Sequence, residues 1–273
     1  MPRLTFFLII LAGALAALPA LAQEPPSAAP QAEPQAAPPP APAAADPAAL
    51  FAESDRAWET RHIAGDTEKS IRLAEEALAK GGDEFESKWR VARGCFWVAE
   101  QSPKDDVKIA YGEKGWKAGE RAAELKPARV EGWFWGVVAL GQYSTGVGIG
   151  KAFFKGLGGK FEKMNGKAIA IDPRYSDGGP TRSLGRYWYK VPAIKRDLEE
   201  SEKLLKQSLA VAPKKLRTHF YLAETYLADD QKDKAKAEID LCLSLDPKDE
   251  EYPDGIVFKK ECEKLKKEAF GQQ

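Results

Sequence analysis

Hydrophobic, small and polar positions follow one order at the ends of four segments, each closed by a proline. In each segment the residue five places before the proline is small, the next is apolar, and the one two places before is aliphatic. Such positions share one face of a helix, and a proline just past the end stops the helix. The pattern predicts helices that pack through a small residue and then turn sharply. The four segments are AAELKP ending at Pro127, AIAIDP at Pro173, SLAVAP at Pro213 and CLSLDP at Pro247.

The same pattern, read along the chain, predicts five helix pairs with unequal insertions. Successive closing prolines are 46, 40 and 34 residues apart, so only the last repeat is near-regular. The amphipathic tail 255–269 predicts a helix that caps the last open face of the stack. No segment alternates with period two, so we expect no sheet. The pairs are expected within residues 47–82, 83–127, 130–173, 184–213 and 214–247.

The last pair resembles a tetratricopeptide (TPR) repeat, whose period is 34 residues. Its large and small apolar residues alternate as in that family, and the others are stretched versions of it. The resemblance implies an all-α solenoid, a superhelical stack of about five TPR-like helix pairs with a C-terminal capping helix. The matching positions are Leu222, Ala223, Tyr226, Ala235, Ile239, Cys242, Leu243 and Pro247.

A second, more specific resemblance covers about residues 131–247. It is to the exported, divergent TPR proteins of the TRAP-transporter T-component type, and it implies a periplasmic location. It also implies association with the substrate-binding partner of a transporter for small organic acids. The lipid-attachment cysteine of some members is absent here. The motif comprises Asp172-Pro173, Gly178-Gly179-Pro180, Leu184-Gly185, Tyr187 and Pro192.

The N-terminal part differs from the helical region in composition. Residues 1–22 have a basic start, an apolar run and a small-residue end, which predicts a secretory signal peptide cleaved after Ala22. An uncleaved anchor is the alternative. Residues 23–47 hold nine prolines and nine alanines, typical of a disordered linker. Residues 48–273 form the predicted helical domain, and the location is expected to be periplasmic or secreted.

The charges of the chain bear on its partners, and its cysteines bear on disulfide pairing. The 41 basic and 41 acidic residues balance, so no global field favours nucleic acid. Three cysteines in an exported chain leave at least one thiol unpaired. We expect Cys95, Cys242 and Cys262 to be buried thiols, with pairing of Cys242 and Cys262 as the alternative.

Candidate binding residues lie in the insertions and on aromatic helices. Residues 144–160 lack the spacing of a phosphate-binding loop. Lys151 and Lys155 there are expected to be solvated on a distorted helix, or to meet an acidic partner or lipid headgroups. Trp133 and Trp135 are expected to pack in the core, with a recognition groove as the alternative.

A helix from Pro180 places Arg182, Arg186 and Tyr189 on one stripe. Two arginines four residues apart predict acidic neighbours, such as Asp172 or Asp177. The alternative is that both guanidinium groups hold a carboxylate or another anion, with Tyr189 beside them.

Catalytic and metal chemistry have little support in the sequence. The two histidines, His62 and His219, lie far apart, and the cysteines show no CxxC spacing. We therefore expect no enzyme, no metal and no cofactor. The sequence favours an exported scaffold for protein–protein or peptide interaction in the periplasm or cell envelope. The alternative is a T-component-like accessory protein that binds or passes a small organic acid.

Overall fold

The computed structural model describes residues 46–249 and 252–271. The predicted signal peptide and all but the end of the predicted linker lie outside the described residues. Within those ranges the chain is all-α, with one short 3₁₀ helix and no strand, as the sequence predicts. The α-helices are α1 (Pro47–Glu59), α2 (Asp66–Ala79), α3 (Glu84–Gln101), α4 (Asp105–Leu125), α5 (Val130–Val147), α6 (Ile149–Phe154), α7 (Leu157–Ile171), α8 (Tyr175–Lys190), α9 (Leu198–Val211), α10 (Leu216–Ala228), α11 (Lys232–Ser244) and α12 (Asp254–Phe270).

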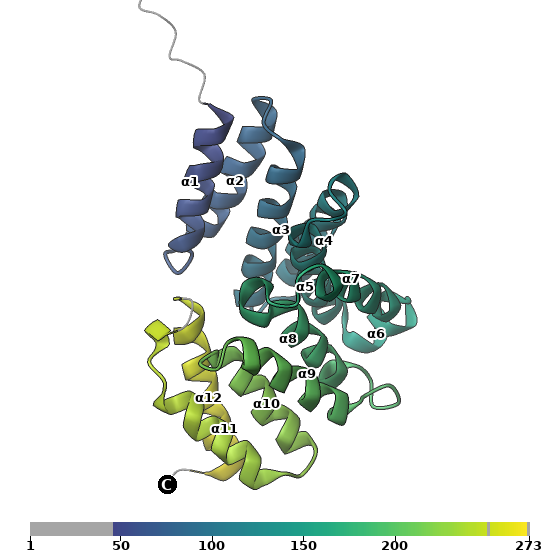
Figure 1. The fold of residues 1–273 in the computed structure, drawn as a ribbon, viewed down its shortest axis with the longest axis vertical. Helices are drawn as coiled ribbons and strands as arrows, with labels where there is room; N and C mark the ends of the chain where they lie inside the picture. The colour runs from purple at the N-terminus through teal and green to yellow at the C-terminus, as the bar shows by residue number, and fades with distance from the viewer. Residues whose placement is uncertain (1–45, 250–251, 272–273) are drawn as a thin grey trace, which may run out of the picture. The chain divides into compact units, whose positions relative to one another are not determined.

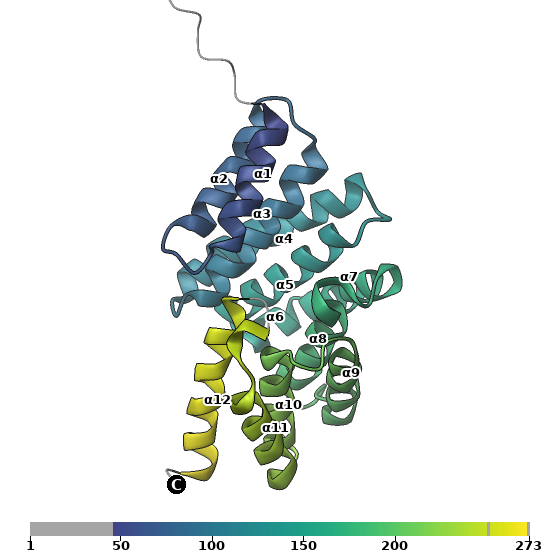
Figure 2. The same ribbon diagram turned by 60° about the vertical axis from the view of Figure 1, so that its left-hand side comes forward.

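The five predicted helix pairs are present in residues 46–271. They are α1/α2, α3/α4, α5/α7, α8/α9 and α10/α11, with α6 as an insertion in the third pair (Figure 1). The first helices of the pairs contact one another in order, from α1 through α3, α5, α8 and α10, and α12 packs on α10 and α11. Figure 2 shows α12 beside these last two helices, so the predicted cap is confirmed.

The repeated small residue explains how the helices approach each other. Ala122, Ala168, Ser208 and Cys242, each five places before a closing proline, are fully buried. The closest approach is between α4 and α5, where a Cβ added to Gly119 would lie 2.2 Å from the Cα of Gly136. A side chain at Gly119 would therefore force the two helices apart, whereas one at Gly136 would first meet the terminal methyl of Met164, at 2.9 Å.

The cysteines differ in part from expectation. Cys242 on α11 and Cys262 on α12 form a disulfide, with their Cα atoms 6.6 Å apart, so the preferred prediction of buried thiols is wrong for this pair. Both cysteines lie in one apolar cluster where the capping helix packs on the last repeat. Cys95 is a free, buried thiol, as predicted, and burial raises its pKa to about 12.

The start of α8 contains a left-handed turn. Ser176, Asp177 and Gly178 have φ values of 49°, 57° and 73°, and regular helix resumes at Gly179 and Pro180. The predicted start of a helix at Pro180 is therefore confirmed. Two of the three residues have a Cβ, which makes this conformation costly unless neighbours hold it.

Candidate functional site

The inner helices enclose a cavity of about 650 Å³, here called the central cavity. Its wall is formed by α1, α3, α5, α8, α10 and α12, with α6 and α7 at one side. Aromatic rings dominate the apolar part of the wall, and charged side chains line it from four helices, α3, α8, α10 and α12. The aromatic lining residues are Trp58, Phe96, Trp97, Phe134, Trp135, Phe153, Phe161, Tyr187, Phe220, Tyr221 and Phe258.

A buried ion-pair network crosses the central cavity and joins the first repeats to the last. The guanidinium of Arg217 on α10 donates to both carboxylate oxygens of Glu100 on α3, at 2.6 and 2.9 Å. It also donates to Asp254 on α12 at 3.1 Å, and Asp254 lies 3.6 Å from Arg61, just beyond α1. Charge-assisted pairs of this geometry are strong when water is excluded. The network therefore ties α3, α10, α12 and the end of α1 together.

Protonation in this network follows from burial and neighbouring charge. Burial alone would raise the pKa of Asp254, but Arg217 and the other cations around it lower the pKa below its usual value. Burial would lower the pKa of Arg217, but Glu100 and Asp254 outweigh that effect and raise it. Both groups stay charged near neutral pH, so the network is ionic.

Helix α8 presents three cationic side chains to the central cavity. Arg182, Arg186 and Lys190 recur every four residues along α8, and all three line the cavity. Arg186 pairs with Glu224 on α10 at 2.6 Å, and the Tyr221 ring lies 4.2 Å from its guanidinium carbon. The predicted acidic neighbour thus exists, but Glu224 fills the role in which the sequence placed Asp172 or Asp177.

Arg182 supports the left-handed turn from inside α8. It is buried, and its guanidinium donates to the backbone carbonyls of Asp177 at 2.8 Å and Ser176 at 3.2 Å. The side chain of Asp177 instead accepts from Lys215 at 3.2 Å. Arg182 therefore holds the backbone that positions the other two cations.

Lys190 is the cation of α8 that sequence reasoning missed. It ends the helix at the cavity wall, and no carboxylate lies within ion-pair distance of it in residues 46–249 and 252–271. Lys190 is exposed at the end of α8. Its pKa is nevertheless lowered, first by partial burial among its neighbours and then by the positive charge of Arg186. The Tyr189 ring lies 5.6 Å from its ammonium. A ligand anion at this point would relieve the repulsion between Lys190 and Arg186.

The remaining predicted site residues divide into two groups. Trp135 lines the cavity and donates to the hydroxyl of Tyr175 at 2.9 Å, whereas Trp133 packs outside it and donates to the carbonyl of Pro127. Tyr189 stacks beside Arg186, with its ring 4.7 Å from the guanidinium, but is not part of the cavity wall. Lys151 and Lys155 are exposed on and after α6, and neither lines the cavity.

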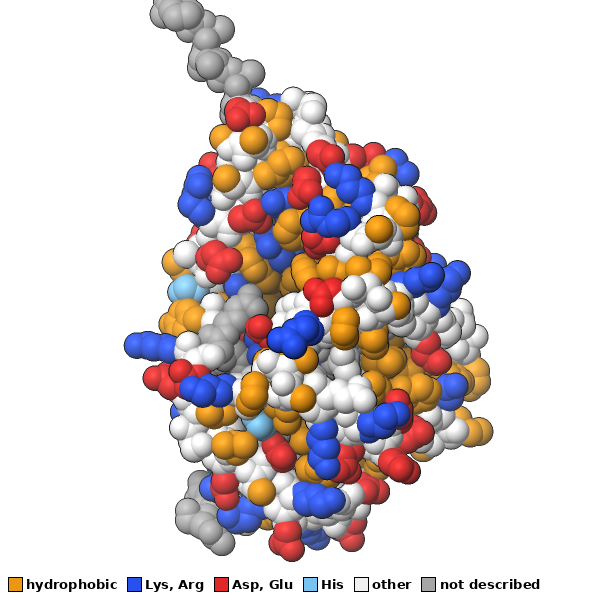
Figure 3. Space-filling view, viewed as in Figure 1, with side chains coloured by type: hydrophobic (Ala, Val, Ile, Leu, Met, Phe, Trp, Pro, Cys, Tyr) orange, Lys and Arg blue, Asp and Glu red, His pale blue; other side chains and the backbone are white. Residues whose placement is uncertain are grey.

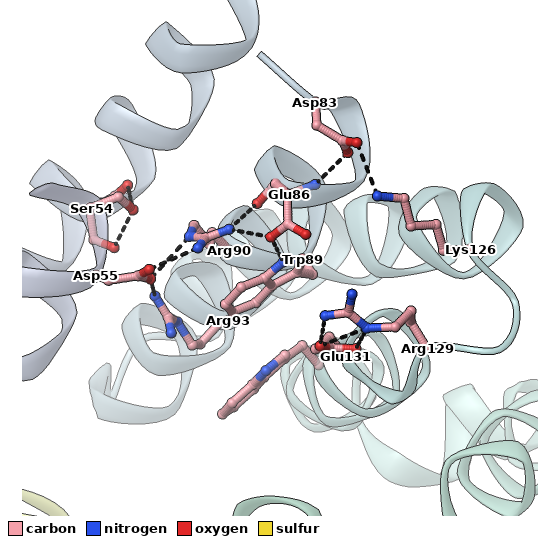
Figure 4. Close-up of polar contacts among 12 residues, drawn as sticks. Ser54, Asp55, Asp83, Glu86, Trp89, Arg90, Arg93, Lys126, Arg129 and Glu131 are labelled. Carbon is pink, nitrogen blue, oxygen red and sulfur yellow. Dashed lines mark hydrogen bonds and ion pairs between the residues drawn. The ribbon is translucent and has the colours of Figure 1, made fainter. Parts of the chain in front are cut away.

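A second polar cluster lies between α1 and α3 in the first repeats (Figure 4). Asp55 on α1 accepts from Arg90 at 2.8 Å and from Arg93 at 2.7 Å, both on α3. Burial would raise the pKa of Asp55, but these two arginines lower it. The guanidinium carbon of Arg93 lies 4.6 Å from the Trp58 ring, which places the cluster behind the aromatic wall of the cavity. The cluster therefore fixes α1 on α3.

The two histidines and the acidic side chains do not form a metal site in the part of the chain that the structure describes. Residues 46–249 and 252–271 contain no group of three His, Cys, Asp or Glu side chains placed to hold a metal ion. In the same ranges, no helix combines the length and hydrophobicity needed to cross a bilayer. His219 contacts Glu238 at 2.7 Å and the carbonyl of Pro213 at 2.9 Å, so it links α10 to α11 and to the segment between α9 and α10.

Comparison with solved structures supports the TPR architecture. A thermophilic TPR protein from Thermus thermophilus, TTC0263, superposes with a TM-score of 0.60 at 19% identity, covering 80% of this chain and all of that one. A MamA structure is similar over 83% of this chain and 96% of its own, at 12% identity and a TM-score of 0.44. No curated protein sequence matches the chain.

Two protein families match the helical region, one over its N-terminal part and one over its C-terminal part. Residues 194–253 match a tetratricopeptide repeat family, which confirms the predicted resemblance to TPR proteins. The resemblance to T-component proteins is not tested by these matches and stays a prediction. Residues 50–196, more than half of the chain, match the family described as "Regulator of microtubule dynamics protein 1-3". This TPR-like chain therefore belongs to the family of regulators of microtubule dynamics 1–3.

Proposed function

We propose that the chain is an exported, non-enzymatic scaffold that holds a short anionic segment of a protein partner in its central cavity. The observation that carries this proposal is the stripe of Arg182, Arg186 and Lys190 on α8, opposite aromatic side chains within a cavity of about 650 Å³. Stacked helix pairs commonly bind partners on their inner surface.

The arrangement of charge favours a carboxylate on the α8 side. Arg217 and Arg61 are matched by Glu100 and Asp254, and Arg186 is matched by Glu224. Lys190 contributes a positive charge next to Arg186 without a carboxylate of its own in the described ranges. An incoming carboxylate would therefore meet Lys190 first, without displacing Glu224, while apolar side chains of the segment contact the aromatic wall.

Export is supported by two separate features. Residues 1–22 have the pattern of a secretory signal peptide. The Cys242–Cys262 disulfide is of the kind that persists in oxidising compartments such as the periplasm. The family name refers to microtubule dynamics, and these two features give no reason to extend that role to this chain.

A second candidate is a T-component-like accessory protein that binds a small organic acid. The volume of the central cavity favours it, since small-molecule sites commonly measure about 300–1,000 Å³. Such an acid would bind the same cation, Lys190, and would cover less of the aromatic wall than a peptide would.

Peptide binding to the purified full-length protein tests the proposal. Arrayed peptides with a free C-terminal carboxylate are compared with the same peptides carrying an amide, and a panel of small organic acids is screened by melting temperature. We expect carboxylate peptides to bind more tightly, and Lys190→Gln to weaken them by about tenfold or more, as for loss of a hydrogen bond to a charged group. Lys167→Gln, an exposed lysine of α7 outside the cavity, is the matched control.

The outcomes separate the two candidates. Peptide binding that is sensitive to Lys190→Gln, with an unchanged melting temperature of the free protein, supports the scaffold. Stabilisation by an organic acid without peptide binding favours the accessory protein. Peptide affinity that is equal in wild type and Lys190→Gln refutes the assigned role of the α8 stripe.

A further inference from the structure

Two insertions that depart from the regular repeat carry the most exposed large hydrophobic residues of the described chain. Phe154 ends α6 with 88% of its surface exposed, and Ile194, between α8 and α9, is 92% exposed. The next most exposed, Ile63, is at 52%. Single exposed apolar residues are common on protein surfaces, but exposed apolar residues that lie close together often mark an interaction site.

The two insertions adjoin each other at one side of the central cavity. Leu157, just after α6, packs with Val191, just after α8, in one apolar cluster. Phe153 and Pro192 both line the cavity beside them. Figure 3 shows hydrophobic side chains gathered at the edge where Figure 1 places α6, with both basic and acidic side chains around them.

Basic side chains flank both exposed residues. Lys151 and Lys155 flank Phe154, while Lys195 and Arg196 follow Ile194. Within the described ranges, Lys151, Lys155 and Arg196 form no ion pair. Lys195 reaches Glu162 only at 3.9 Å. One acidic residue, Asp197, also lies in the second insertion, where as the N-cap of α9 it accepts from the backbone N–H of Glu200.

We infer that this edge, defined by Phe154, Ile194, Lys151, Lys155, Lys195 and Arg196, docks on the surface of a bilayer that contains anionic phospholipid. Protruding apolar side chains enter the headgroup region while the surrounding cations meet lipid phosphates, as in peripheral membrane anchors. A bilayer suits this edge better than an acidic protein, since each apolar side chain protrudes singly instead of lining a groove. Docking would bring the side of the central cavity formed by α6 to the membrane surface.

Vesicle binding by the full-length protein tests the inference. Co-sedimentation is measured with phosphatidylcholine vesicles and with vesicles that also contain phosphatidylglycerol. We expect binding to the anionic vesicles alone, weakened by salt, since basic residues near a membrane act through screened electrostatics. The double variant Lys151→Gln/Lys155→Gln should lower the partition coefficient by about fivefold per charge.

Separate variants test the contribution of the exposed hydrophobic residues to vesicle binding. Phe154→Ser/Ile194→Ser should abolish most of the binding, and its melting temperature should match wild type because both residues are exposed. Ile63→Ser and Lys232→Gln, exposed residues on other parts of the described chain, serve as controls and should bind as wild type does.

Three outcomes would overturn the inference. They are no binding of wild type to anionic vesicles, equal binding of the Phe154→Ser/Ile194→Ser variant, and equal loss in the control variants. The peptide assay on the central cavity uses no lipid, so the two proposals fail or succeed separately.

Discussion

Removal of Arg217 tests whether the buried network holds the two ends of the repeat stack together. In Arg217→Ala, Glu100 loses both of its hydrogen bonds from the guanidinium, and Asp254 loses its contact at 3.1 Å but keeps the longer one to Arg61 at 3.6 Å. Only 8% of the Arg217 side chain and 15% of the Glu100 side chain are exposed, so water screens neither charge well. Loss of one partner from a buried pair costs about 3–5 kcal/mol.

Urea unfolding measures this loss, with the free energy obtained by linear extrapolation. The matched control is Arg121→Ala. Arg121 also forms a two-bond pair with a glutamate, Glu84, at 2.9 and 3.0 Å, but both side chains are exposed to solvent. Since water screens exposed pairs, we expect the control to lose only a small fraction of the stability that Arg217→Ala loses.

A double variant tests how much of the loss in Arg217→Ala comes from the carboxylate of Glu100 that is left without its partner. Glu100→Gln/Arg217→Met leaves no uncompensated carboxylate at position 100, so this variant should be clearly more stable than Arg217→Ala. Hydrogen exchange should show faster opening of α12 in Arg217→Ala, because Asp254 is the residue that ties α12 to the network. Equal losses for Arg217→Ala and Arg121→Ala would refute the role assigned to the network.

Three further predictions concern the disulfide of the capping helix, the left-handed turn at the start of α8, and stability at low pH. Cys242→Ser should lower the free energy of unfolding by about 3 kcal/mol, from the chain-entropy model for the closed loop, and added reductant should destabilise wild type alone. Arg182→Gln should cost about 2–3 kcal/mol in urea unfolding, because two charged hydrogen bonds to the left-handed turn are lost; an unchanged midpoint contradicts this. The pKa of Asp254 is lowered on folding, so its stabilising effect is complete above its usual value of 3.8 and is lost as pH falls below it. Acid unfolding of Asp254→Asn should therefore lack this part of the pH dependence.

The fold was predictable because each repeat carries its own local signal. The small residues Ala122, Ala168, Ser208 and Cys242 mark helix crossings, and all four are fully buried at such crossings. The prolines that end helices and the amphipathic pattern of the tail are also local signals, because each acts within one or two helical turns. Stacked repeats contact mainly their neighbours, so local patterns determine most of the architecture.

Two features of the chain depend on more than local pattern. The disulfide joins residues 20 positions apart, and its formation depends on how the capping helix packs on α11, which two cysteines in helical sequence do not specify. The start of a helix at Pro180 was predicted, but the left-handed conformation of the turn before it and the role of Arg182 in holding the carbonyls of that turn were not. A side chain that caps the turn of its own helix looks, in sequence, like one that faces a ligand.

The central cavity was the least predictable part, because its closure depends on the curvature of the whole stack. Glu100 and Arg217 are 117 residues apart, and no repeat pattern relates them. They meet because the inner helices turn far enough for α3 to face α10 and α12 across the cavity. Small rotations between successive pairs add up along a solenoid, so an error in one crossing angle would separate these side chains. Arg182 and Arg186 were visible in the sequence as a stripe, but which cation of α8 has a carboxylate partner depends on α10, whose Glu224 pairs with Arg186.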